Sequence, residues 1–251
     1  MIKLSAVITC FNNEDTIVKC IESLKFVDEI IVLDSLSTDK TMDLLQPLKC
    51  RVHQQKFKGY SQQKQDAINL CSHDWVFLLD SDEFLTDQAQ ETIKSWKSQT
   101  PKAEAYELPR REWVFWQWSR SWVHMNKFVR LFDKTKAKVS NDLVHESIQS
   151  SGRISILNAI IKHYGETSIQ RKLEKINQYS QLAAEQKFKQ GKKVHPIKLM
   201  VYPVWCFFKQ YFIRRQILNG WAGFVNAKLN TKYAFLKYAK LYELQQNKLD
   251  K

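Results

Sequence analysis

Residues Trp75 to Phe84 read WVFLLDSDEF, an apolar run that ends abruptly in three carboxylates, Asp80, Asp82 and Glu83. A run of β-forming apolar residues is typical of a strand that is buried on both faces of a sheet. Open α/β sheets bind ligands beyond the carboxyl ends of their strands. Two aspartates one residue apart at such an end can supply oxygen ligands to Mg²⁺ or Mn²⁺. D-x-D also occurs by chance in solvated acidic loops, so the upstream sequence has to support the interpretation.

The upstream sequence contains further strand patterns. Residues 2–11 and 29–34 are apolar runs of strand length, and the second run ends in Asp34. Residues 50–55 form a weaker strand pattern. Because the carboxyl ends of parallel strands share one edge of a sheet, we expect Asp34 and Asp80 at the same edge.

Helical patterns follow these strands. Asn12 and Asn13 are good helix N-caps, and the apolar residues within 17–24 recur at helical spacing. Residues 61–71 form the helix pattern that precedes the acidic strand. Strands that alternate with helices predict an α/β fold with a mostly parallel sheet flanked by helices and right-handed crossovers.

Three segments in this order resemble the inverting family 2 glycosyltransferases, which have the Rossmann-like GT-A fold. They are AVITCFNNEDTIVKCIESL at 6–24, VLDSLSTDKT at 32–41 and GYSQQKQDAINLCSHDWVFLLDSDE at 59–83. VHE at 144–146, HYGE at 163–166 and NGWAGF in the tail extend the resemblance to the small cytoplasmic enzymes that add glucose to heptose in the lipopolysaccharide inner core. The resemblance implies a UDP-glucose donor, a heptose acceptor and Mg²⁺ or Mn²⁺.

The resemblance also implies residues that bind the donor. Thr9 and Phe11 end the first strand where the family places uracil, Glu14 follows in the loop, and an aromatic ring there can stack on a base. Asp34 matches the aspartate that accepts hydrogen bonds from the nucleoside, although it could instead cap the next helix. Lys64 lies where the family commonly has a cation near the diphosphate, although it could also be a solvated helix lysine.

The metal ligands implied by the resemblance are Asp82, Asp80 and His163, with Asp82 the direct ligand of the D-x-D pair. Asp80 would also contact the donor. His163 matches a late histidine that completes the metal shell. A histidine hydrogen-bonded in a partly buried loop is the alternative at this position.

An inverting transfer also needs a general base that takes the proton of the acceptor hydroxyl. NDLVHES at 141–147 supplies Asp142, His145 and Glu146. Glu146 occupies the place of the base in the wider fold, and Asp142 is the second candidate. The family's usual acidic pair is replaced here by His145 and Glu146.

Residues 109–130 place four tryptophans among arginines. Indole rings can pack on the C–H faces of sugars, and arginines can bind phosphates or carboxylates. The segment therefore predicts either an acceptor-binding surface or a hairpin that covers the edge of the sheet. Arg130 could serve either arrangement.

The net charge of +13 belongs to the C-terminal part of the chain. Residues 1–150 carry 20 Lys and Arg against 21 Asp and Glu, whereas residues 151–251 carry 19 against 5. We expect a GT-A catalytic domain at 1–165 and a basic, aromatic, helical tail at 166–251.

The tail suits an anionic membrane surface. Its apolar run at 197–208 is interrupted by Lys198 and Pro203 and is shorter than the roughly 20 residues that span a bilayer. Each cation near an anionic surface contributes about 1 kcal/mol to binding. Met1 to Phe11 leads directly into a strand, and the five cysteines show no C-x-x-C spacing, so we expect reduced thiols in a cytoplasmic protein peripheral to the inner membrane. The alternative for the tail is a helix that merely closes the sheet.

Other functions fit the sequence less well than sugar transfer to a heptose. A nucleic-acid-binding protein would also be basic and aromatic, but it would have no use for acids gathered at strand ends, and we expect no nucleic-acid partner. A nucleotidyltransferase would normally have a glycine-rich, basic loop after its first strand, whereas this loop reads FNNED. A family 2 enzyme acting on another glycan or on a polyprenyl phosphate would differ only in its acceptor.

Overall fold

The computed structural model describes residues 1–140 and 147–249. The chain divides into two compact units, the first comprising Met1–Arg111 with Met125–His163 and the second Glu112–His124 with Tyr164–Lys251. Each unit is described separately below. A functional boundary at residue 165 stays a prediction.

The main sheet is mixed, with the strand order β3-β2-β1-β4-β8-β6-β12-β5. Its strands are β1 (Leu4–Cys10), β2 (Glu29–Asp34), β3 (Arg51–Gln54), β4 (Trp75–Asp80), β5 (Glu83–Leu85), β6 (Ala105–Val114), β8 (Asn126–Asp133) and β12 (Ile161–Glu166), with β7 (Gln117–Trp118) and β11 (Ile154–Ile156) paired to β6. β3, β2, β1 and β4 are parallel, whereas β8 runs antiparallel to β4 and to β6. The predicted α/β class and its parallel strands are confirmed.

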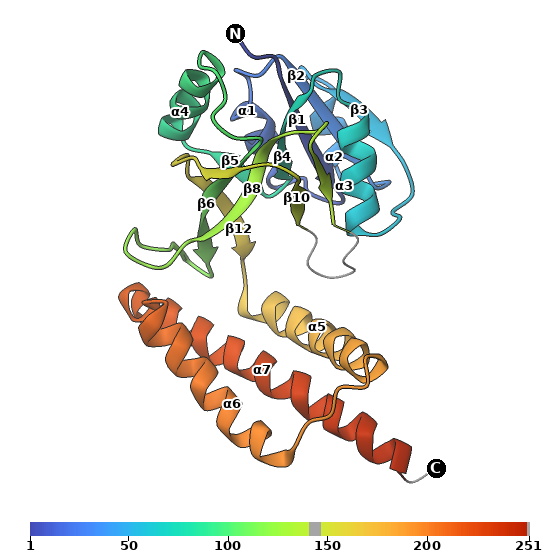
Figure 1. The fold of residues 1–251 in the computed structure, drawn as a ribbon, viewed down its shortest axis with the longest axis vertical. Coiled ribbons are helices and arrows are strands. Elements are labelled where there is room, and N and C mark those ends of the chain that lie inside the picture. The colour runs from blue at the N-terminus through green and yellow to red at the C-terminus, as the bar shows by residue number, and fades with distance from the viewer. Residues whose placement is uncertain (141–146, 250–251) are drawn as a thin grey trace. The chain divides into compact units, whose positions relative to one another are not determined.

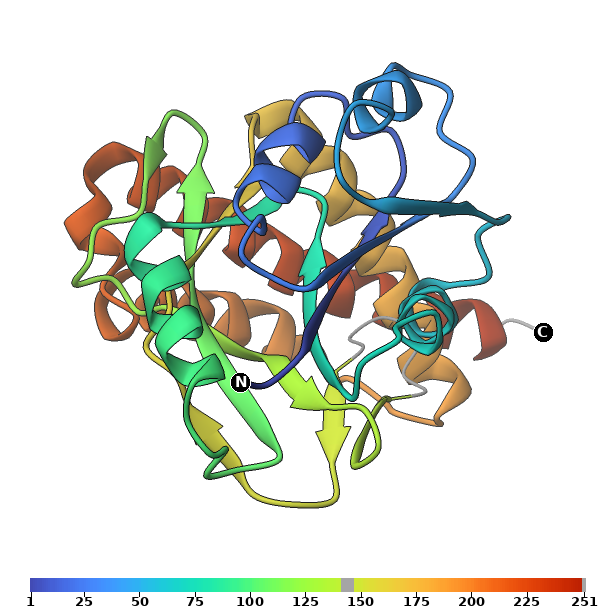
Figure 2. The ribbon, with the colours of Figure 1, turned by 90° about the horizontal axis from the view of Figure 1, so that it is seen from above.

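Alternating side chains of the central strands supply two hydrophobic cores. Ala6, Ile8, Phe77 and Leu79 face one core together with α1 (Ile17–Glu22), α2 (Thr41–Leu45) and α4 (Asp87–Lys97). Val7, Val76 and Leu78 face the other core together with α3 (Tyr60–Asn69) and the hairpin of β9 (Ala137–Val139) and β10 (Ile148–Ser150). Helices α1 and α2 therefore cover the face of the sheet opposite to α3 (Figure 2). Burial on both faces explains why these strands are almost wholly apolar.

The predicted helix caps at Asn12 and Asn13 are wrong. Helix α1 begins at Ile17 with Thr16 in the N-cap position. Asn12 adopts a positive φ of 53°, and the Asn13 carboxamide oxygen accepts hydrogen bonds from the Phe11 amide and the Ser81 hydroxyl. Asparagine tolerates the left-handed region, so both residues shape the loop after β1 rather than start the helix.

The second unit is helical. It contains α5 (Ile169–Lys189), α6 (Pro196–Phe208), a π-helix (Lys209–Ile213), a 3₁₀-helix (Gln216–Asn219) and α7 (Gly220–Leu249), and α7 packs against both α5 and α6 (Figure 1). The helical tail predicted from the sequence is confirmed. Within the described part of the chain, none of the helices combines the length and apolarity required to cross a bilayer.

Candidate functional site

Three strand ends meet at one edge of the sheet. β1 lies between β2 and β4, so Cys10 pairs with Asp34 and Thr9 pairs with Asp80. The prediction that Asp34 and Asp80 share an edge is confirmed. The loops that leave these strands surround the site.

A cavity of about 700 Å³ opens at this edge. Six of the predicted donor and metal residues line it: Thr9, Phe11, Lys64, Asp80, Asp82 and His163. Its other lining residues are Cys10, Asn13, Ser35, Lys56, Phe57, Tyr60, Gln63 and Ser81. Its volume lies within the range of cavities that hold a small ligand or cofactor.

Asp80 is held by two cations. Lys64 Nζ lies 2.7 Å from one carboxylate oxygen, and an Arg130 guanidinium nitrogen lies 2.9 Å from the other. Burial raises the pKa of Asp80, but the charges of Lys64 and Arg130 outweigh it, so the pKa lies well below its ordinary value. Lys64 is therefore a buried partner of the D-x-D motif and not a solvated helix lysine.

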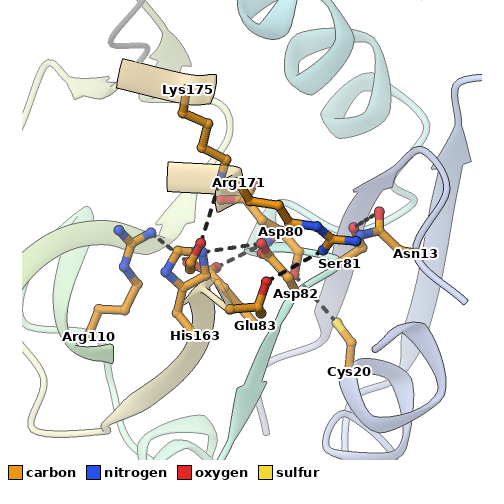
Figure 3. Close-up of polar contacts among 12 residues, drawn as sticks. Asn13, Cys20, Asp80, Ser81, Asp82, Glu83, Arg110, His163, Arg171 and Lys175 are labelled. Carbon is orange, nitrogen blue, oxygen red and sulfur yellow. Dashed lines mark hydrogen bonds and ion pairs between the residues drawn. The ribbon is translucent and has the colours of Figure 1, made fainter. Parts of the chain in front are cut away.

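Glu83 lies behind Asp80 and is fully buried. Its carboxylate accepts hydrogen bonds from the Asp80 amide at 3.1 Å, from Arg110 at 2.9 Å and from Arg130 at 2.6 Å (Figure 3 shows Asp80, Glu83 and Arg110). Burial alone would lower the pKa of Arg130. The carboxylates of Glu83 and Asp80 raise it by a larger amount, so the pKa lies above its ordinary value and the guanidinium stays charged. Glu83, whose role the sequence left open, and Arg130 thus fix the position of the first aspartate.

Asp82 and His163 form the second part of the acidic site. His163 Nε2 lies 3.3 Å from Asp82 Oδ2, and both side chains line the cavity (Figure 3). Within residues 1–140 and 147–249, no group of three or more His, Cys, Asp or Glu side chains is placed to hold a metal. One carboxylate and one imidazole suit a divalent ion that takes its remaining oxygen ligands from diphosphate or water.

Asp34 and Glu14 do not line the cavity. Asp34 is fully buried and accepts hydrogen bonds from Ser37 and Gln54, the amide of Gln54 at 2.9 Å. Burial alone would raise the pKa of Asp34, but these hydrogen bonds lower it by a larger amount, so the pKa lies below its ordinary value and the carboxylate is charged. Its hydrogen bonds hold the loop after β2 in place. Glu14 accepts a hydrogen bond from the Lys40 amide at 3.0 Å in the same loop.

The sequence reasoning missed an aromatic pair at the cavity. Phe57 and Tyr60 pack edge to face with ring centroids 5.1 Å apart, and both rings are about half exposed. They flank Gly59, whose φ of 99° permits the turn between β3 and α3. An exposed aromatic pair on either side of a glycine, directly after a strand, was the available signal. These rings and Phe11 offer stacking surfaces for a base.

The tryptophan-rich segment forms a hairpin. Trp113 of β6 pairs with Trp118 of β7, and Tyr164 lies 5.0 Å from the Trp118 ring. Trp116 and Trp122 are exposed. The hairpin extends from β6, which lies between β8 and β12 in the sheet order, and both expected roles of the segment, acceptor binding and cover of a sheet edge, stay predictions.

The proposed general bases lie outside the described residues. Glu146, Asp142 and the neighbouring His145 fall within 141–146. Their assignment stays a prediction that rests on the family resemblance.

The chain is similar to known proteins over most of its length. The glycosyl transferase family 2 model matches residues 5–165. The uncharacterized glycosyltransferase RT0209 of Rickettsia typhi is 34% identical over 257 residues, which cover 97% of this chain and 88% of that protein. The lipopolysaccharide core biosynthesis glycosyltransferase LpsC of Rhizobium meliloti is 31% identical over 248 residues, with coverage of 96% and 92%.

A solved structure of low sequence identity has a similar fold. S. aureus TarS 1–349 in complex with UDP-GlcNAc superposes with a TM-score of 0.50 and 14% sequence identity, covering 98% of this chain and 92% of the TarS 1–349 chain. At this identity the likeness concerns the fold alone. The mixed sheet flanked by helices, with its C-terminal helices, is the expected GT-A architecture. Together with the family match over most of the sheet-bearing part, these similarities show that the chain is a glycosyltransferase that belongs to glycosyl transferase family 2.

Proposed function

We propose that this protein is a metal-dependent inverting glycosyltransferase that moves glucose from UDP-glucose to a heptose of the lipopolysaccharide inner core. The observation that carries the proposal is the convergence of Asp80, Asp82 and His163 on one cavity that Phe57 and Tyr60 also line. The names of the relative LpsC and of the TarS complex support a lipopolysaccharide acceptor and a UDP-sugar donor, respectively.

The cavity offers separate surfaces for the parts of the donor. Phe11, Phe57 and Tyr60 would hold uracil by stacking. Asp82 and His163 would hold Mg²⁺ or Mn²⁺, which when bound neutralises the departing diphosphate. The carboxylate of Asp80 is already paired with Lys64 and Arg130, which fix its position beside the diphosphate. Asp82 would therefore be the principal ligand of the metal ion.

A second cavity suits the acceptor. It has a volume of about 460 Å³ and shares Lys64 and Asp80 with the donor cavity. Arg110 and Lys127 line it, and the Arg110 guanidinium lies 4.2 Å from the Phe128 ring centroid. A cation stacked on an aromatic ring, with a second cation nearby, is a surface for a phosphorylated sugar. We place the acceptor heptose there.

Reversing one charge in the acceptor cavity should separate acceptor binding from donor binding. Lys127→Glu should raise the KM for a phosphorylated inner-core acceptor at least about tenfold, because a charge-assisted contact is worth roughly 1.5–3 kcal/mol. UDP affinity should not change. Steady-state kinetics and UDP titration measure the two effects. Lys138→Glu makes the same charge change on the exposed face of β9, outside the cavity, and is the control. Equal KM values for the two variants would contradict the placement.

Removal of the general base should affect turnover alone. We expect Glu146→Gln to keep UDP binding and to lower kcat by roughly 10²- to 10⁴-fold, the usual contribution of a positioned base. Asp142→Asn should have the smaller effect if Glu146 is the base. Near-normal turnover of Glu146→Gln would show that the base lies elsewhere.

The acceptor class is tested directly by mass spectrometry. Incubation with UDP-glucose should add one hexose to a heptose-terminated lipopolysaccharide core and none to a polyprenyl phosphate. Transfer to the polyprenyl phosphate alone would favour the other branch of family 2. Binding to DNA without sugar transfer would instead favour a nucleic-acid-binding protein, which the acidic strand ends disfavour. A lipid-linked acceptor places the enzyme in the cytoplasm, peripheral to the inner membrane.

A further inference from the structure

Helix α6 presents an apolar face that nothing in the described structure covers. Although the helix is mostly apolar, it has no buried residue. Its exposed apolar residues are Ile197, Met200, Val201, Val204, Trp205 and Phe208, and we call them the α6 face. Their spacing follows the 3.6-residue period, so they occupy one side of the helix. Met200 and Val204 are 76% and 70% exposed.

The other side of α6 is the side that packs within the unit. Tyr202 lies edge to face with Tyr238 of α7, with ring centroids 5.0 Å apart. Phe207 contacts Phe224 in the same way, and Cys206 Sγ lies 3.9 Å from the Asn230 carbonyl oxygen. The α6 face is therefore not needed for contact with α7.

The apolar surface continues beyond α6. A π-helix follows α6 directly, and its residues Phe212 and Ile213 are also exposed. Ile217 and Leu218 of the 3₁₀-helix and Trp221 at the start of α7 are exposed as well, Trp221 by 78%. The Phe212 ring lies 5.2 Å from the Phe208 ring of the α6 face, measured between centroids, so exposed apolar side chains continue from α6 into the π-helix. Exposed apolar surface of this kind marks an interaction site.

The charge around this surface has one sign. Between Glu185 and Glu243 the sequence contains 12 lysines and arginines and no aspartate or glutamate. Lys192 and Lys193 are exposed before α6, and Lys209 and Arg215 are exposed after it. A second copy of the chain would bring like charges together at the contact, whereas an anionic lipid surface is complementary to them.

We propose that the α6 face binds an anionic lipid bilayer, with α6 in the plane of the interface and its apolar side chains below the headgroups. The flanking cations would contact lipid phosphates. Trp205 and Trp221 suit this depth because indole combines an apolar body with a polar N–H group. The proposal goes beyond the donor chemistry, since docking requires neither UDP nor turnover.

The test is sedimentation of the full-length protein with vesicles of equimolar phosphatidylcholine and phosphatidylglycerol. We expect the wild type to bind these vesicles, to bind pure phosphatidylcholine vesicles at least about tenfold more weakly, and to lose affinity as salt increases. Absence of binding to the anionic vesicles at low salt would overturn the proposal. This comparison uses the unaltered protein and does not depend on any variant.

A triple variant locates the surface. Ile197→Ser, Met200→Ser and Val204→Ser together should weaken vesicle binding at least about tenfold and leave circular dichroism and the unfolding midpoint unchanged. Ile156→Ser with Leu182→Ser removes exposed apolar side chains elsewhere and should bind like the wild type. Equal binding by the triple variant would overturn the assignment. The assignment would also be overturned if ultracentrifugation showed that the wild type is a dimer and the triple variant a monomer, and neither protein bound vesicles. The α6 face would then be a dimer contact.

Discussion

Asp82→Ala should abolish metal-dependent UDP binding and leave the fold intact. Asp82 lines the donor cavity, its side chain is partly exposed, and it forms an ion pair with His163 at 3.3 Å. Loss of groups that merely orient metal ligands costs roughly 10- to 100-fold in metal affinity, and loss of a direct ligand should cost at least about 100-fold. Titration with UDP in the presence of Mn²⁺ measures the effect.

Two further variants sharpen this test. Asp87→Ala removes an exposed carboxylate five residues further on, in the first turn of α4, and should bind UDP like the wild type. His163→Ala should weaken binding in the same metal-dependent way as Asp82→Ala. Metal-dependent UDP binding that survives in Asp82→Ala would remove the second D-x-D aspartate from the donor site.

Glu83→Ala should be the most destabilising carboxylate substitution at the site. Glu83 is fully buried and accepts hydrogen bonds from Arg110, Arg130 and the Asp80 amide. Its removal breaks the buried ion pairs with Arg110 and Arg130, and breaking a buried pair costs roughly 3–5 kcal/mol in the free energy of unfolding. Urea denaturation followed by tryptophan fluorescence measures the loss.

The control for this prediction is Glu91→Ala. Glu91 pairs only at the surface with Lys94, three residues away in α4, so its removal should change the free energy of unfolding little. Glu83→Gln keeps an acceptor oxygen and should lie between the two variants. A Glu83→Ala protein as stable as Glu91→Ala would mean that the buried network of Glu83 does not stabilise the fold.

The parallel half of the sheet could be predicted because its signals are local. Buried strands such as β4 are continuous apolar runs, and the acids that follow them report the carboxyl edge without knowledge of the tertiary fold. Thr9, Phe11, Lys64 and the D-x-D residues were therefore placed at one cavity by the sequence and its resemblance to a family.

The partners of Glu83 could not be predicted because they depend on long-range pairing. β4 pairs antiparallel with β8, β5 pairs antiparallel with β12, and in this sheet Arg130 of β8 lies 2.6 Å from Glu83 of β5. No local pattern reports it. The start of α1 was misplaced because asparagine serves turns as well as caps, and Asn12 and Asn13 take the turn role. The full burial of Asp34 and its bonds to Ser37 and Gln54 also depend on the tertiary fold, and its contact with the nucleoside stays a prediction.

The most direct test of the donor site is calorimetric titration of the wild-type protein with UDP, UDP-glucose, GDP and CDP, first with Mn²⁺ and then with EDTA. The proposal predicts binding that is selective for uridine nucleotides and is lost in EDTA, because Asp82 and His163 would hold the diphosphate through a cation. Binding of none of the nucleotides in either condition would contradict the assignment of the cavity at the ends of β1 and β4 as a metal-dependent UDP-sugar site.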